Sequence, residues 1–172
     1  MDQIALYLEY HKSIYHTCLR ILRSPEDAEE CMQDAFLKLF TGGKMRFINN
    51  KACYSWLRKV AVRGAIDRLR SLDFQMNVNT GSLESREVRT VTNEEPEEDR
   101  QHQVRLVREQ LNALPSGYRT ILSLYLFEGY DFEEIAQITR LQPSTVRSQY
   151  SRGRKKLQEE IEKLWKIGRA NV

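Results

Sequence analysis

The sequence contains no uninterrupted apolar stretch of the roughly eighteen residues that a membrane-spanning helix requires. It begins with no basic flank before an apolar run and no cleavage site of small residues, so we expect no signal peptide. Cysteine is rare, since Cys18, Cys31 and Cys53 are the only three among 172 residues. Their spacing matches no zinc-binding pattern and their neighbours are apolar, which predicts reduced thiols in the core of a cytosolic protein.

Strand-like alternation of apolar and polar residues is also absent, and no repeat occurs. Apolar residues recur instead at spacings of three and four over most of the chain, which predicts an all-α fold. The length allows one large or two small domains. A hydrophobic content of 41% is sufficient for compact cores.

The formal net charge of +3 conceals a strong segregation of charge. Residues 71–100 contain eight acidic and three basic side chains, whereas residues 44–70 contain eight basic and one acidic, and residues 141–157 contain five basic and no acidic ones. The acidic segment lacks periodicity and is rich in Asn, Thr, Ser and Glu. We therefore expect a flexible acidic linker over 71–100 between two small helical domains, 1–70 and 101–172. The two basic patches predict two contacts with a polyanion.

The first domain is expected to open with a helix over residues 4–23, whose buried stripe would contain Leu8, His11, Tyr15, Cys18, Leu19 and Leu22. A second helix starts at Ser24-Pro25-Glu26-Asp27, which combines a cap, a proline and two acids favoured by the helix dipole. It ends at Gly42-Gly43. The face opposite its apolar stripe is acidic. Such a face is usually only solvated, but Leu37 beside the acidic positions indicates a contact with another protein.

A loop over residues 44–50 leads into a third helix over 51–70, whose buried side would contain Leu57, Val60, Ala61, Ala65 and Leu69. Aromatic residues gather with cations around the start of this helix, at Phe47, Tyr54, Trp56, Arg58, Lys59 and Arg63. Rings that stack unpaired bases and charges that hold phosphates are what a single-stranded nucleic acid needs. The alternative for Trp56 is a place in the core.

The second domain is predicted to contain four helices. The first spans residues 101–114, with one apolar side made of Val104, Val107, Leu111 and Leu114, and a short apolar helix follows over 118–127. The last two helices form a helix-turn-helix within residues 131–157. Asp131 and Glu134 form a capping box, and Pro143 suits the first position of the final helix. Arg140 occupies the turn position where Gly is usual because the backbone there is left-handed, which costs about 1 kcal/mol.

The final helix has one packed face and one polar, cationic face. Its packed face is expected to contain Val146, Tyr150, Gly153 and Leu157, which recur at helical spacing. The opposite face has the size and hydrogen-bonding character that fit a DNA major groove. It contains Ser144, Thr145, Arg147, Ser148, Ser151, Arg152, Arg154 and Lys155. The alternative is a solvated basic helix in an ordinary bundle.

Three stretches together resemble the bacterial sigma factors of the extracytoplasmic-function group. The helix of sigma region two that grips the clamp of RNA polymerase is similar to SPEDAEECMQDAFLKLF. The following helix, which engages the minus-ten promoter element, is similar to YSWLRKVAVRGAIDRLR. Sigma region four, which reads the minus-thirty-five element, is similar to LNALPSGYRTILSLYLFEGYDFEEIAQITRLQPSTVRSQYSRGRKKL. The order and joint presence of these stretches are highly specific, and the two-domain layout is that of the minimal group.

The resemblance implies a role for each polar face. Core polymerase would be contacted by Glu30, Gln33, Asp34 and Leu37. The minus-ten element would be captured as unstacked bases by Phe47, Asn49, Asn50, Tyr54, Trp56, Arg58, Lys59 and Arg63. The polar face of the final helix would read the minus-thirty-five element, chiefly through Thr145, Arg147, Ser148 and Arg152. The family pattern commonly has Asn at Arg63, Gly at Arg140 and Ala at Gly153.

The resemblance also implies partners and a location. The expected partners are the RNA polymerase core, promoter DNA as duplex and as single-stranded non-template strand, and an anti-sigma factor. We expect no cofactor, no metal and no small-molecule substrate. The implied location is cytoplasmic, at the inner membrane where an anti-sigma factor holds the chain there.

Two other functions compete with an alternative sigma factor. A stand-alone helix-turn-helix regulator of duplex DNA leaves the acidic face and the Trp56 region unexplained, and it would need a dimerisation surface for paired half-sites. A DNA-cutting or rejoining enzyme would need a nucleophile with a base, or a cluster of metal-binding carboxylates. The acids of residues 26–34 and 94–99 converge on no pocket. The sequence therefore favours a non-catalytic subunit that gives RNA polymerase its promoter specificity.

Overall fold

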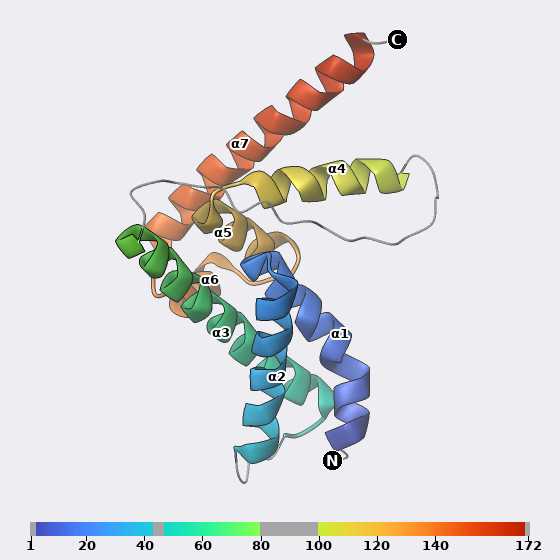
Figure 1. Cartoon of the computed structure of the whole chain (residues 1–172), viewed down its shortest axis with the longest axis vertical. Helices are drawn as coiled ribbons and strands as arrows, with labels where there is room; N and C mark the ends of the chain where they lie inside the picture. Colours follow the sequence, from blue (N-terminus) through green and yellow to red (C-terminus); the bar gives the residue numbers. More distant parts are fainter. Residues whose placement is uncertain (1–2, 43–46, 80–99, 171–172) are drawn as a thin grey trace. The chain divides into compact units, whose positions relative to one another are not determined.

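The computed structural model describes residues 3–42, 47–79 and 100–170. Within these ranges the regular secondary structure consists of α-helices, numbered α1 to α7 in Figure 1, which confirms the predicted all-α fold. The chain divides into two compact units, Met1–Val88 and Arg89–Val172. None of the helices in the described ranges has the length and apolar character that crossing a membrane demands.

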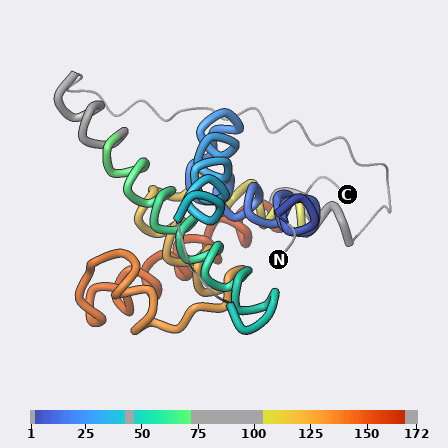
Figure 2. The backbone as a smooth tube through the Cα atoms, turned by 90° about the horizontal axis from the view of Figure 1, so that it is seen from below, coloured from blue at the N-terminus to red at the C-terminus, as the bar shows by residue number. Residues whose placement is uncertain are grey.

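Unit 1 is a bundle of three helices, α1 (Gln3–Leu22), α2 (Pro25–Thr41) and α3 (Asn50–Asn79). Each of these helices packs against the other two, and Figure 2 shows α3 running past α2 within this unit. The centre of the bundle is apolar and includes Ile14, Cys18, Ile21, Ala28, Ala35, Leu57, Ala61 and Ala65, each at most 1% exposed. The three cysteines are buried thiols that form no disulfide, as the sequence predicts.

The buried face of α1 differs from the expected stripe. Leu8 was expected inside but is 66% exposed, whereas Leu6, Ile14 and Ile21 are buried. Half-buried His11 is a structural residue, because its Nδ1 lies 2.9 Å from the carbonyl oxygen of Tyr7. Cys18 and Leu22 of the expected stripe are buried. Apolar residues surround much of this helix, so periodicity alone identifies only part of its buried face.

The ends of α2 follow the local signals in the sequence. The Ser24 hydroxyl oxygen accepts a hydrogen bond from the Asp27 backbone N–H at 3.2 Å, and Pro25 is the first helical residue. At the other end the N–H of Gly42 donates to the carbonyl oxygen of Lys38 at 3.0 Å. Gly43 lies outside the described residues. These caps determine where α2 begins and ends.

The third helix is longer than the sequence predicts. It was expected to end at residue 70, but α3 continues to Asn79, so the interpretation of 71–79 as linker is wrong. Extending a helix that has already formed costs little, because each added residue gains a hydrogen bond. Residues 80–99 of the expected linker lie outside the described residues. Leu57, Ala61 and Ala65 are buried as expected, while the expected core residues Val60 and Leu69 are only half-buried.

Unit 2 contains α4 (Arg100–Ala113), α5 (Ser116–Leu126), α6 (Phe132–Thr139) and α7 (Pro143–Ala170). Leu111, Leu114, Leu122 and Leu157 form a core cluster, and Tyr118, Tyr150 and Ile161 pack against it. The first half of α4 does not follow the prediction. Val104 and Val107 were expected on the buried side but are 54% and 36% exposed, because only the second half of α4 is covered within the described part of unit 2.

The helix-turn-helix has the caps that the sequence predicts. The Asp131 carboxylate accepts from the Glu134 N–H at 2.7 Å, and the Glu134 carboxylate accepts from the Asp131 N–H at 3.1 Å. Pro143 is the first residue of α7. Ile135 of α6 and Val146 of α7 are fully buried, and the two helices pack against each other. The second helix is therefore held on its apolar face, which leaves its polar face exposed.

Gly153 lies at a close approach between α7 and α5. A Cβ atom added there would be 3.0 Å from Cβ of Tyr118 and 3.3 Å from Cδ1 of Leu122. The Tyr118 Cβ is held by its backbone and cannot move aside as the end of a long side chain would. This contact is a physical reason why Gly replaces the Ala of the family pattern.

Arg140 has the left-handed backbone expected at the turn, with φ 55° and ψ 33°. Left-handed geometry costs a non-Gly residue about 1–2 kcal/mol. Replacing Arg140 by Gly removes this cost, but the greater freedom of Gly in the unfolded chain offsets part of the gain in stability. We expect Arg140→Gly to raise the unfolding free energy of unit 2 by about 0.5–1 kcal/mol. Thermal unfolding followed by circular dichroism measures this change.

Arg140→Ala is the matched control, because it removes the same exposed side chain without relieving the backbone. It should leave stability unchanged or slightly lower. Equal stability of the Gly and Ala variants would contradict the assignment of strain. Arg23, with φ 59°, is a second left-handed residue, and the sequence pattern does not reveal it.

Candidate nucleic-acid interface

The polar face of α7 presents the predicted duplex-binding residues together. Seven of the eight are exposed and Thr145 is half-buried. None is part of the core cluster, which lies on the opposite face with Gly153 and Leu157. The structure thus places all eight on one side of a helix that the rest of unit 2 supports from behind.

Three aromatic rings support the helix-turn-helix from α5, α6 and α7. The ring centroids of Tyr125 and Phe132 are 4.9 Å apart, those of Tyr125 and Tyr150 are 4.7 Å apart, and those of Phe132 and Tyr150 are 5.1 Å apart. Each ring comes from a different helix, so the cluster fixes α7 relative to the two helices beneath it. Sequence periodicity identifies Tyr150 as a packed residue but gives no sign of this cluster.

An ion pair links the two helices of the motif across their exposed side. Arg147 Nη2 donates to Glu133 Oε1, and the two side chains are 55% and 58% exposed. Further along α7, Lys155 lies 4.0 Å from Glu159. The sequence analysis predicted that Arg147 and Lys155 bind DNA, but it did not predict these acidic partners. In the structure, two of the predicted DNA-binding cations are therefore already paired with a carboxylate.

The aromatic residues at the start of α3 fall into two separate groups. Phe47 and Trp56 are half-buried and their ring centroids lie 5.8 Å apart. Tyr54 instead faces α1, where its ring lies 4.8 Å from Tyr10 and its hydroxyl 2.7 Å from the Ser13 hydroxyl. Phe47 and Trp56 are therefore paired with one another, whereas Tyr54 is tied to the bundle.

The polar residues around this helix start also divide by role. The Asn49 side-chain oxygen accepts from the Ala52 N–H at 2.9 Å, which is the contact of a helix N-cap. Asn50, Lys59 and Arg63 are exposed, and the Arg58 guanidinium lies 5.9 Å from the centre of the Tyr54 ring. Asn49 thus has a structural function that the sequence prediction did not include.

Ile48 is a surface feature that the sequence prediction missed. It is 96% exposed and lies next to Phe47. This exposed isoleucine adds apolar surface next to Phe47 in the chain. Ile48 lies in a loop between two helices, so no helical periodicity marks it in the sequence.

The acidic face of α2 keeps Asp34 and Leu37 exposed, with Leu37 at 59%. Gln33 donates a hydrogen bond to Glu29 at 3.3 Å. Glu30 is also exposed but is bound within the unit, because Arg68 of α3 donates to its carboxylate. The four predicted residues therefore share one surface, with Glu30 fixed and Asp34 exposed at its middle.

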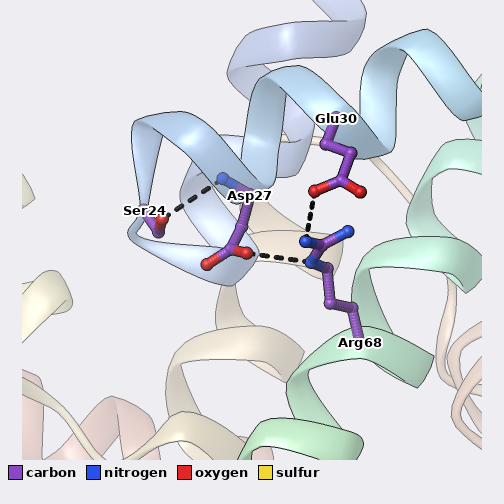
Figure 3. Close-up of polar contacts among 4 residues, drawn as sticks. All are labelled: Ser24, Asp27, Glu30 and Arg68. Atoms are coloured by element: carbon purple, nitrogen blue, oxygen red, sulfur yellow. Dashed lines mark hydrogen bonds and ion pairs between the residues drawn. The ribbon is translucent and has the colours of Figure 1, made fainter.

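Arg68 joins α3 to the start of α2, as Figure 3 shows. Its Nε donates to Asp27 at 2.9 Å, and its Nη2 donates to Glu30. The Asp27 side chain is 16% exposed and that of Glu30 is 61% exposed, so Asp27 is the more buried end of the bridge. The hydrogen bond to Glu30 is the main cause of the raised pKa of Arg68. This bridge ties the start of α2 to α3.

Among the described residues, no group of three or more His, Cys, Asp or Glu side chains is placed to hold a metal ion. Burial raises the pKa of the Cys53 thiol. A hydrogen bond with Cys18 lowers the pKa of Cys31, whose thiol donates to the Ala61 carbonyl oxygen at 3.5 Å. These thiols belong to the core of unit 1 and lie away from its exposed polar faces.

Both units match known families. Residues 6–74 match Sigma-70 region 2, and residues 105–157 match Sigma-70, region 4. The ECF RNA polymerase sigma factor SigW of Bacillus subtilis is 26% identical over 162 residues, covering 90% of this chain and 86% of SigW. The RNA polymerase sigma-H factor of Pseudomonas aeruginosa is 27% identical over 167 residues, covering 92% and 86%.

A solved structure shares the fold. It is that of the sigma factor RpoE in complex with the anti-sigma factor NepR from Bartonella quintana, with a TM-score of 0.61, 18% sequence identity, and coverage of 91% of this chain and 94% of that one. Two sigma regions in this order, on an all-α chain, define a sigma-70 type sigma factor. The chain belongs to the extracytoplasmic-function group of that family.

Proposed function

We propose that this chain acts as an alternative sigma factor, which binds the RNA polymerase core, recognises promoter DNA and helps to melt it at the start of transcription. The observation that carries the proposal is the joint presence of Sigma-70 region 2 and region 4 over 6–74 and 105–157. The family is regulatory and non-catalytic. The alternative, a stand-alone regulator of duplex DNA, would not explain why the chain contains Sigma-70 region 2.

The work divides between the two regions. We assign residues 1–70 to polymerase and minus-ten binding and residues 101–172 to minus-thirty-five binding. The exposed face with Asp34 and Leu37 suits a protein partner, since it mixes acidic and apolar side chains. The polar face of α7 suits duplex DNA, because basic and hydroxyl side chains share it.

An anti-sigma factor is the further partner that we propose. The fold neighbour was solved in complex with the anti-sigma factor NepR, which supports such a partner for this chain. Transcription takes place in the cytoplasm, so we place the active chain there. Its inactive form would be held by the anti-sigma factor, at the inner membrane where that factor is membrane-bound.

The test adds the purified chain to core RNA polymerase and a duplex selected from a random-sequence library. Specific initiation, read as a transcript of defined length, is the expected result. Core polymerase alone and the chain alone are the controls. Duplex binding without initiation would favour the stand-alone regulator and overturn the proposal.

A further inference from the structure

Glu133 is an acidic residue beside the proposed base-reading face. It lies in the first turn of α6, and its carboxylate accepts a hydrogen bond from Arg147 of α7. Both side chains are more than half exposed. Exposed ion pairs of this kind add little to stability. The fold alone therefore does not account for this pair.

The position of Glu133 is unusual for a DNA-binding surface. In a helix-turn-helix the first helix crosses the phosphate backbone and the second enters the major groove. A carboxylate on the exposed side of the first helix repels phosphates unless a cation compensates its charge. Arg147 provides that charge, so the pair presents no net charge to DNA.

The pair also restricts what Arg147 can bind. A guanidinium has five N–H donors in a planar fork, and Glu133 occupies the Nη2 end of it. An unrestrained arginine can swing to any nearby phosphate. An arginine held by a carboxylate keeps its remaining N–H donors in a fixed direction. Two such donors match the two hydrogen-bond acceptors on the major-groove edge of guanine.

We propose that Glu133 is a specificity-determining residue for promoter recognition. By pairing with Arg147 it keeps that guanidinium from phosphates and directs it to a guanine edge in the major groove. The inference rests on the proposed function, in which Arg147 reads the minus-thirty-five element. Glu133 itself makes no base contact and acts through Arg147 as a positioning residue.

Glu133→Gln tests the proposal, because it keeps the shape of the side chain and removes its charge. The full chain assembled with core polymerase is titrated with a library-selected duplex and a scrambled duplex over a range of salt. We expect tighter binding to the scrambled duplex and a salt slope more negative by about 0.9, equivalent to one more phosphate contact. The ratio of selected to scrambled affinity should fall by about fivefold, the low end for one arginine–guanine contact.

Glu162→Gln is the matched control on the same unit. It removes the same charge fifteen residues along α7 from Arg147, about 22 Å away by helical rise. That distance exceeds the screening length of about 8–10 Å at ordinary salt, so the ratio and slope should stay as in the wild type. In an Arg147→Ala background, Glu133→Gln should leave the ratio of selected to scrambled affinity unchanged, because no guanidinium remains to be directed and the relief of phosphate repulsion acts alike on both duplexes.

Three outcomes would overturn the inference. An unchanged ratio and slope for Glu133→Gln is one, and an equal fall of the ratio on Glu133→Gln in the Arg147→Ala background is another. A lower melting temperature with an unchanged ratio would assign the pair to stability. If the wild-type chain neither assembles with core polymerase nor selects a duplex, the proposed function fails first and the inference fails with it.

Discussion

Replacing Asp34 by lysine is expected to weaken binding to core RNA polymerase by roughly tenfold to a hundredfold, or about 1.4–2.8 kcal/mol, because the lysine would repel the basic partner surface that Asp34 is proposed to meet. Asp34 is exposed on the face of α2 that carries Leu37. An exposed charge contributes only about 0–1 kcal/mol to folding, so the melting temperature should hardly change. Titration of a labelled chain with core polymerase measures the affinity.

Glu9→Lys is the control for Asp34→Lys, because it makes the same charge change at an exposed position of α1 in the same unit. It should leave core affinity close to the wild-type value. Equal weakening by both variants would mean that overall charge governs association, and an unchanged affinity for Asp34→Lys would remove the acidic face of α2 from the interface.

Replacing Phe47 by alanine is expected to slow or abolish promoter melting while closed-complex binding persists. A stacked ring supplies about 1–3 kcal/mol for each base that leaves the duplex. Phe47 is only half-buried, and its ring contacts Trp56, so the ring is available to an unpaired base without being needed by the bundle core. Permanganate reactivity of unpaired thymines, with polymerase present, reports the melting.

Two variants separate stacking from a general apolar contact. Phe47→Tyr keeps the ring and should melt the promoter normally, whereas Ile48→Ala removes exposed apolar surface without removing a ring. Normal melting by Phe47→Ala would exclude the residue from strand capture. Normal melting after Phe47 and Arg63 are altered together would overturn the strand-capture role of this part of unit 1.

Local signals in the sequence were sufficient to place the ends of several helices. Ser24, Asp131 and Pro143 each act within one helical turn, so their roles follow from neighbours that are adjacent in the chain. The left-handed turn at Arg140 was predictable for the same reason. These features position α2 and α7, and with them the candidate binding faces.

The buried face of α1 and the end of α3 could not be read in the same way. In α1, apolar side chains lie on more than one side, and only packing against α2 and α3 decides that Ile14 is buried and Leu8 exposed. In α3, residues 71–79 extend the helix without an apolar pattern to mark them. Helix propagation needs no such pattern, so composition suggested a linker.

Contacts between distant residues explain what was missed in the candidate site. Arg68 lies 41 residues from Asp27, and Arg147 lies 14 residues from Glu133. No spacing rule relates such residues until the fold brings their helices together. The sequence therefore predicted which faces are polar, while the structure showed which of their charges are already paired.

The distribution of thiols has a practical consequence for following this protein in solution. All three cysteines lie in unit 1 and are buried. Alkylating dyes need an accessible thiolate. A cysteine introduced at exposed Lys166 of α7 would therefore react ahead of the native thiols, with none of them removed. A fluorophore attached there would report promoter encounter from unit 2 alone, on a chain whose core is chemically untouched.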